Sequence, residues 1–198
     1  MRCQRFILTI GLLFAPALHA ATFSVSSAAD SGNNTLRWAI TQANATPAAD
    51  TIVFNIGGGG ARNIALASAL PAITAPVSID GGTQPGYTNA PLIQLDGRAA
   101  GAGIDGVHLA SSTSVLRALS IIGFTASGVL IDGPGGNTVT VCHIGLNGGG
   151  GALGNGHTGV YIRSSPNNQI GPGNVISANA VDGVRIDLAA ATGNAVFG

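Results

Sequence analysis

The sequence contains neither lysine nor glutamate, although it is 198 residues long. Its charge comes from eight arginines and eight aspartates, and charged residues make up 8% of the chain, against about 25% in ordinary globular proteins. Lysine and glutamate are strong helix formers that usually cover the exposed faces of amphipathic helices. Their absence argues against a mainly helical protein.

Cysteine and long hydrophobic runs are also scarce. The two cysteines are Cys3 and Cys142, and Cys3 lies in the segment interpreted below as a leader. Cys142 then has no partner, so no disulfide framework is available and packing must hold the fold. We interpret Cys142 as a small buried residue. The apolar run from Phe6 to Phe14 is much shorter than the roughly 20 residues that span a bilayer.

Residues 1–20 have the features of a secretory signal peptide. Arg2 and Arg5 precede the apolar run, and Leu18-His19-Ala20 offers a cleavage site. We therefore predict a secreted or cell-surface protein with no stable membrane span after cleavage. Cleavage leaves six arginines against eight aspartates, a net charge of −2, which argues against a nucleic-acid partner.

Glycine is abundant, and a short motif repeats. The 31 glycines are about twice the usual share, and together with asparagine they separate short runs of β-branched residues. A Gly-Val-x-Ile/Leu unit occurs four times, with starts 22, 31 and 24 residues apart. The units begin at Gly106, Gly128, Gly159 and Gly183. The long interval contains residues 146–158, which we predict to be a loop that bulges from one repeat.

Asparagines recur at similar offsets within the repeats. Asn137, Asn168 and Asn194 follow the Gly-Val units, and Asn155 and Asn179 each precede one by four residues. Glycine and asparagine tolerate left-handed backbone angles, so these positions predict turns between two or three short strands per repeat. One such repeat cannot bury its own apolar face, but stacked repeats share an interior. The pattern predicts an all-β, right-handed parallel β-helix.

Alternation along each strand predicts which side chains face inward. The buried columns should contain Val107, Leu109, Val129, Ile131, Val160, Ile162, Val184 and Ile186. Earlier strands are expected at 51–54, where the sheet should begin, and at 77–80 and 92–96. Gly57 to Gly60 should form a turn.

The open end of a solenoid needs a cap, and one helix is predicted there. Leu36, Ala39, Ile40 and Ala43 have the spacing of one helical face. Asn34 is the expected N-cap, and Pro47 prevents continuation. The predicted organisation is a signal peptide at 1–20, an N-terminal cap and first strand at 21–56, and β-helix repeats at 57–198, open at the C-terminal end. The uncapped edge would allow self-association.

The outward positions carry the candidate chemistry. One column reads Ala110, Asp132, Arg163, Asp187, and the column beside it reads His108, Leu130, Tyr161, Arg185. Arg163 should lie between two carboxylates, about 4.8 Å from each along the column. This is a solvated ion-pair ladder in one interpretation. In another it is a ligand-binding strip, because tyrosine and arginine stack on sugars and hydrogen-bond to them. The candidate binding residues are Tyr161, Arg163, Arg185, Asp132 and Asp187.

A catalytic interpretation of the same face is weaker. Asp132 and Asp187 would be roughly 9–10 Å apart, near the upper end of the range for inverting glycosidases. Arg163 between them would favour the charged form of both, whereas a general acid must hold a proton. We therefore name no catalytic residue. His108, His143 and His157 lack metal-ligand spacing, so neither a metal nor a cofactor is predicted.

Several longer motifs resemble a known family. They are Asp30-Ser31-Gly32 with Leu36-Arg37 and Ala39-Ile40, Gly82-Thr83-Gln84-Pro85-Gly86-Tyr87, Ile144-Gly145-Leu146-Asn147 with Ala152-Leu153-Gly154-Asn155, and Gly173-Asn174-Val175-Ile176-Ser177. They are similar to the cap and turns of bacterial secreted or surface proteins with right-handed parallel β-helix repeats. The resemblance covers nearly all of the chain after residue 20. It implies architecture and brings no catalytic residues.

The function expected from these observations is that of a secreted or cell-surface scaffold. It would recognise a polysaccharide or cell-surface glycan through its outer strips and the loop at 146–158, or mediate adhesion, without catalysis. One alternative is a polysaccharide lyase or glycoside hydrolase that acts from the outer face, since fold alone does not decide activity. Another is the N-terminal part of a larger surface adhesin, because members of the resembled family are commonly longer.

Overall fold

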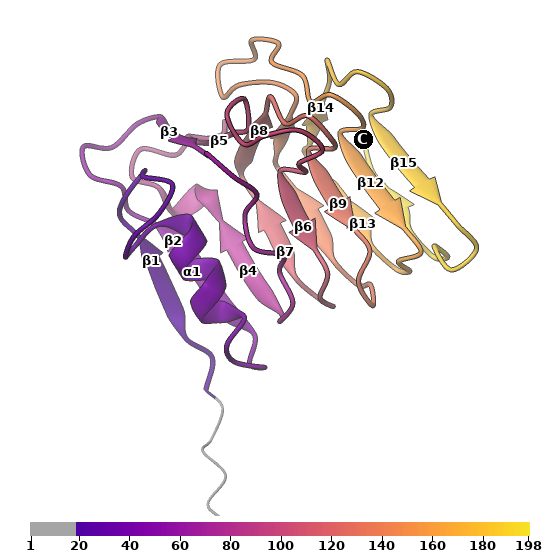
Figure 1. The fold of residues 1–198 in the computed structure, drawn as a ribbon, viewed down its shortest axis with the longest axis horizontal. Helices are drawn as coiled ribbons and strands as arrows, with labels where there is room; N and C mark the ends of the chain where they lie inside the picture. Colours follow the sequence, from indigo (N-terminus) through magenta and orange to yellow (C-terminus); the bar gives the residue numbers. More distant parts are fainter. Residues whose placement is uncertain (1–18) are drawn as a thin grey trace, which may run out of the picture.

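The computed structural model describes residues 19–198, so nearly all of the predicted leader lies outside the described residues. Within this range the chain forms one α-helix, a single 3-10 turn (η1, Gly81–Thr83) and sixteen short strands. Every pair of neighbouring strands is parallel, and the strands stack into three sheets of seven, five and four. The parallel β-helix is confirmed, and Figure 1 shows its coils side by side along the long axis.

Sheet A is the longest of the three and begins earlier than expected. Its first strand precedes the helix and pairs with the strand at Asp50–Phe54, so the sheet does not start at Thr51. In spatial order sheet A contains β1 (Thr22–Val25), β2 (Asp50–Phe54), β4 (Val77–Asp80), β7 (Val115–Arg117), β10 (Thr138–Thr140), β13 (Gln169–Ile170) and β16 (Ala195–Val196).

Sheets B and C complete each coil. Sheet B contains β3 (Arg62–Ala65), β5 (Ile93–Asp96), β8 (Leu119–Ile122), β11 (His143–Ile144) and β14 (Val175–Ile176). Sheet C contains β6 (Val107–Leu109), β9 (Val129–Ile131), β12 (Val160–Arg163) and β15 (Val184–Asp187). The four Gly-Val-x-Ile/Leu units are therefore the four strands of sheet C, which faces the viewer in Figure 1.

The interior consists of stacked aliphatic columns, as the alternation predicts. Val107, Val129 and Val160 are buried in register, and so are Leu109, Ile131 and Ile162. The prediction fails for the last repeat, where Val184 is half-buried and Ile186 is 44% exposed. Both lie in the final coil, and no described residue stacks on its outer side. The large exposed apolar residues of the described chain are Val175, Val181, Ile186, Leu188, Val196 and Phe197.

Buried asparagines join the coils at their turns. Asn168 Oδ1 accepts hydrogen bonds from the backbone and side-chain amides of Asn137, at 2.9 and 3.0 Å. Asn168 in turn donates to Asn194 Oδ1 from both of its own amides, at 2.8 and 2.9 Å. Asn155 and Asn179 repeat the arrangement at another corner. Each amide satisfies a backbone group of the neighbouring coil where no strand pairing is available.

Cys142 is fully buried, as the sequence interpretation expects. It follows Val141, whose positive φ of 56° turns the chain from sheet A to sheet B. The Cys142 backbone amide donates to Asn174 Oδ1 at 2.9 Å, so this position stacks on an asparagine turn. Burial raises the pKa of the thiol to about 12, and Cys142 stays neutral and packs as a small apolar residue.

The helix α1 (Leu36–Ala43) packs on β1 and β2 through the predicted face. Leu36, Ala39, Ile40 and Ala43 are all buried. The N-cap is Thr35 rather than Asn34, because Thr35 Oγ1 accepts from the Trp38 amide at 3.2 Å. Asn34 instead has a φ of 58°, which turns the chain into the helix from outside it.

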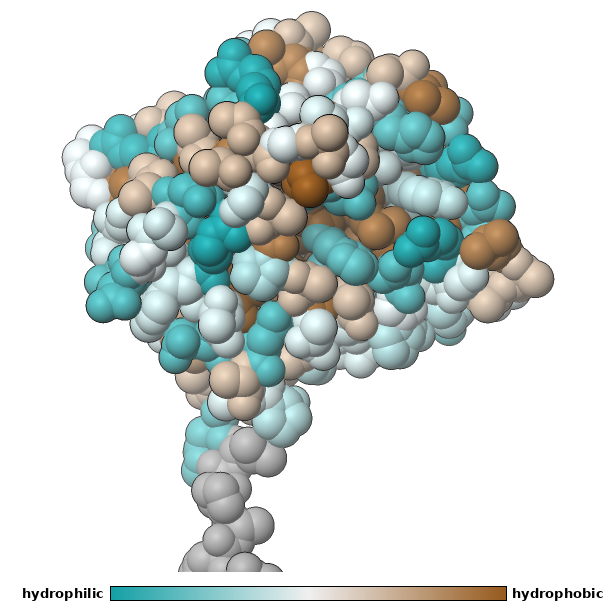
Figure 2. Space-filling model, viewed as in Figure 1, coloured by the Kyte–Doolittle hydropathy of each residue, from teal (hydrophilic) through white to brown (hydrophobic). Residues whose placement is uncertain are grey.

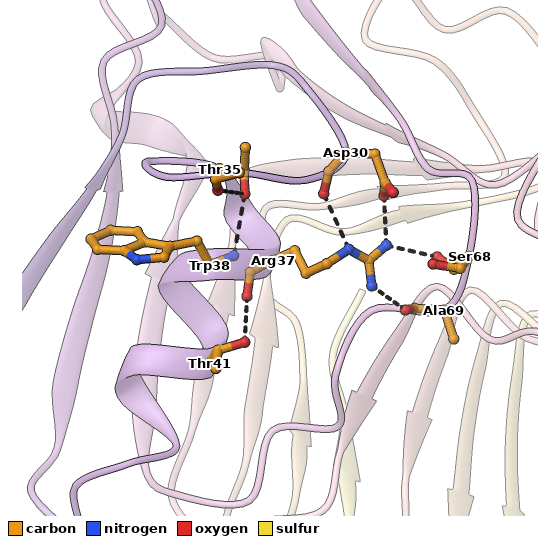
Figure 3. A network of polar contacts seen from close by, with 8 residues as sticks. Asp30, Thr35, Arg37, Trp38, Thr41, Ser68 and Ala69 are labelled. Atoms are coloured by element: carbon orange, nitrogen blue, oxygen red, sulfur yellow. Dashed lines mark hydrogen bonds and ion pairs between the residues drawn. The ribbon is translucent and has the colours of Figure 1, made fainter.

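One arginine fastens this helix to the next coil (Figure 3). Arg37 pairs with Asp30 Oδ1 at 2.5 Å and donates from Nε to the Asp30 carbonyl at 3.1 Å. The same guanidinium donates to the carbonyl oxygens of Ser68 and Ala69. Because Ser68 and Ala69 lie in the coil that follows, Arg37 ties three chain segments together at the capped end.

Candidate functional site

The candidate residues meet on the outer face of sheet C, in the register the repeats predict. Leu130, Tyr161 and Arg185 are neighbours across β9, β12 and β15, and Arg163 lies opposite Asp187 in the backbone register. Hydrophilic side chains lie over these strands in Figure 2, which has the same view as Figure 1. Leu130 is only 8% exposed although it lies at an outward position, so the column of His108, Leu130, Tyr161 and Arg185 contains one covered apolar residue.

Asp132 is the centre of the first polar cluster on this face. His108 Nε2 lies 2.5 Å from Asp132 Oδ1, and Arg163 Nη2 lies 2.7 Å from Asp132 Oδ2. Partial burial alone would raise the pKa of Asp132, but hydrogen bonds from His108 and Arg163 outweigh it and lower the pKa. Asp132 is therefore ionised at neutral pH, and His108 donates its Nε2–H to it.

The second cluster forms around Asp187. Arg185 Nη2 lies 2.9 Å from Asp187 Oδ2, and the Tyr161 hydroxyl donates to the same oxygen at 3.4 Å. The Arg185 guanidinium also lies over the Tyr161 ring, 5.4 Å from its centroid. The centroid of the His157 ring is 6.3 Å from the centroid of the same tyrosine ring. The hydrogen bond from Arg185 lowers the pKa of Asp187.

The three charged residues alternate along one column as expected, but Arg163 does not bridge both carboxylates. Arg163 forms an ion pair with Asp132 only, and Asp187 takes Arg185 from the neighbouring column as its partner. The pair of Arg163 and Asp132 joins neighbouring strands directly, whereas Asp187 pairs with Arg185 on its own strand and His108 reaches Asp132 diagonally. Contacts along a strand and diagonal contacts therefore compete with contacts between residues in register. The structure brings all five candidate residues together, but as two adjoining clusters. Their role in binding stays a prediction.

The chemistry open to this face follows from those pairs. Both carboxylates are held ionised by arginine, so neither is suited to donate a proton at neutral pH. Nowhere in residues 19–198 do three or more metal-binding side chains gather into a site. The same range has no helix with the length and apolar character needed to cross a membrane.

A groove on another face was not anticipated. It has a volume of about 500 Å³ and lies over sheet B, between β3, β5 and the loop after β11. Its walls are Ala61, Arg62, Asn63, Ala90, Pro91, Leu92, Gln94, Asn147, Gly148 and Gly149. The glycine-rich loop was visible in the sequence. The face it would cover was not, because β3 falls outside the clear repeats.

A scan against protein-family models finds no match, and a search of curated proteins finds no similar sequence.

Proposed function

We propose that the chain is a non-catalytic β-helix scaffold that binds polysaccharide through the outer face of sheet C. The observation that carries the proposal is the two adjoining clusters, which place Tyr161, Arg163 and Arg185 on one surface formed by rigid strands. Tyrosine rings and guanidinium groups contact the faces and hydroxyls of sugars, and strands hold such groups more precisely than loops do.

Electrostatics favour binding over catalysis on this face. A general acid needs a pKa near the working pH, whereas the pKa values of Asp132 and Asp187 are both lowered. With each carboxylate neutralised by an arginine, the face carries little net charge and would suit a neutral or weakly charged glycan.

Export and surface location belong to the same proposal. The segment at residues 1–20 has signal-peptide chemistry, and the cap and turn motifs resemble bacterial secreted β-helix repeat proteins. We place the chain among such scaffolds, outside the cytoplasm, where a glycan ligand would be met.

The test is co-sedimentation of the purified protein with a panel of insoluble polysaccharides. We expect binding to at least one of them, and Tyr161→Ala and Arg163→Met should each weaken it about tenfold, or 1.4 kcal/mol. The matched control is Arg117→Met, which removes an arginine paired with Asp80 at 2.6 Å on sheet A. Equal losses in the control, or no binding by the wild type, would refute the proposal.

A further inference from the structure

The groove over sheet B is a preformed cavity. The loop that closes it is held by its own asparagine, since Asn147 Oδ1 accepts from the amides of Gly149 and Gly151 at 3.0 and 2.8 Å. The Leu146 carbonyl accepts from Ser120 Oγ at 2.7 Å, which fastens the loop to β8. Gly148 approaches the Pro91 carbonyl so closely that a Cβ there would clash. The groove therefore keeps its shape without a ligand.

Arg62 gives this groove an uncompensated positive charge. Of the six arginines in residues 19–198, five form ion pairs with aspartate, and Arg62 is the exception. Its guanidinium donates three of its five N–H bonds to the carbonyl oxygens of Gly57 and Ala61. These contacts fix its position and leave two N–H bonds for a ligand. Two such donors match the two oxygens of a carboxylate.

The other walls combine amides with an apolar surface. Gln94 Nε2 donates to Asn63 Oδ1 at 2.8 Å, which leaves Gln94 Oε1 as an acceptor. Asn147 uses its Oδ1 within the loop, while no described hydrogen bond uses its Nδ2. Pro91 and Leu92 supply carbon surface beside these groups. Amides pair with hydroxyls in both directions, and apolar side chains pack against sugar C–H groups.

We propose that this groove binds a carboxylate-bearing sugar, a hexuronate unit of an acidic oligosaccharide. Arg62 takes the carboxylate, the amides of Gln94 and Asn147 take ring hydroxyls, and Pro91 and Leu92 cover a C–H face. Charge complementarity selects the acid over a neutral sugar, because no carboxylate of the described chain pairs with Arg62. The site is separate from the outer face of sheet C and stands independently of the function proposed for that face.

The experiment is calorimetric titration of the full chain with oligogalacturonate and oligomannuronate, each compared with its methyl ester. We expect at least one acid to bind, its ester to bind at least about tenfold more weakly, and added salt to weaken the acid only. Arg62→Met should reduce affinity for the acid to that of the ester. Arg117→Met, on sheet A and outside both proposed sites, is the matched control and should leave binding of the acid unchanged.

A second groove variant keeps the proposal testable if Arg62→Met does not fold. Gln94→Ala removes a side chain whose only hydrogen bond goes to Asn63, and it should weaken acid and ester alike while circular dichroism stays unchanged. The proposal is overturned if the wild type binds neither acid, or if ester and acid bind equally. It is also overturned if Arg163→Met, and not a groove variant, removes binding. That last result would support the sheet C proposal instead.

Discussion

Buried asparagines supply many of the hydrogen bonds that join neighbouring coils at their turns. Asn137, Asn155 and Asn168 are essentially inaccessible, and each forms a hydrogen bond to the backbone or a side chain of a neighbouring coil. A turn cannot continue the strand ladder, so its amides need other partners. The side chains supply them, and the free energy of unfolding should depend on each.

Replacing Asn137 with alanine tests that dependence. Asn137 Oδ1 accepts from the buried Ser114 amide at 3.0 Å, and its Nδ2 donates to the Ser111 carbonyl at 3.1 Å. Leaving such buried groups unpaired costs about 1–3 kcal/mol. Urea unfolding should report a loss of that size, whereas the exposed control Asn89→Ala should unfold as the wild type does. Equal midpoints for both variants would show that the buried hydrogen bonds of Asn137 add nothing to stability.

The Asp132 pair makes stability depend on pH. An unfolded aspartate titrates near 3.8, and His108 and Arg163 lower that pKa in the folded protein. The pair therefore stabilises the fold at pH values above about 4, and this contribution is lost as the pH falls through the folded pKa. In urea unfolding across the acid range, Asp132→Asn should flatten the rise in stability with pH. Arg163→Met should flatten it in part. An unchanged profile in both variants would contradict the assignment.

For single residues, the sequence predicts which face a side chain lies on better than it predicts the residue with which that side chain pairs. The repeat places Asp132, Arg163 and Asp187 on one face correctly, because strand alternation leaves no other choice. It does not decide which carboxylate Arg163 takes, since side-chain rotamers make that choice. The asparagines were recognised as turn residues. That they point inward depends on the coil stacked beside them, which the local sequence does not show.

The helix α1 should contribute to stability through its buried face. Ile40 lies on the inner face of this helix, which packs on β1 and β2, and is almost completely buried. Ile40→Ala should lower the free energy of unfolding by about 2–5 kcal/mol, through lost burial and the cavity left behind. Thr41→Ala, on the exposed side of the same helix, is the control and should have little effect. Urea unfolding of the two variants gives the comparison, and equal stability would mean that the helix does not cap the coils.

The sequence predicts this helix face correctly and its first turn less well. Asn34 and Thr35 are both good N-cap residues, and only the positive φ of Asn34 decides between them. The strand β1 was missed because its four residues, TFSV, give too short a pattern beside the leader. Strands of two residues, such as β11 and β13, are too short for alternation to detect.

For the whole molecule, the repeated sequence motif explains why the β-helix could be predicted from the sequence. Parallel stacking makes each unit the template for the next, so four Gly-Val-x-Ile/Leu units are enough to define the solenoid. The irregular interval is only partly a bulge. Asn155 and Thr158 are buried in the coil, and the excursion over sheet B is restricted to the part closed by the Leu146–Ala152 bridge. The groove arises from that excursion, which repetition alone does not predict.

The central claim is that this scaffold binds polysaccharide without cleaving it. The most direct test incubates purified protein with each polysaccharide that it retains and follows polymer length by size-exclusion chromatography. Our account predicts unchanged length with the wild type. It also predicts that binding is largely kept when Asp132 and Asp187 are both replaced by asparagine, because tyrosine and arginine supply the contacts. Shortening of any polymer by the wild type, and its loss in Asp132→Asn, would contradict the account and identify an enzyme.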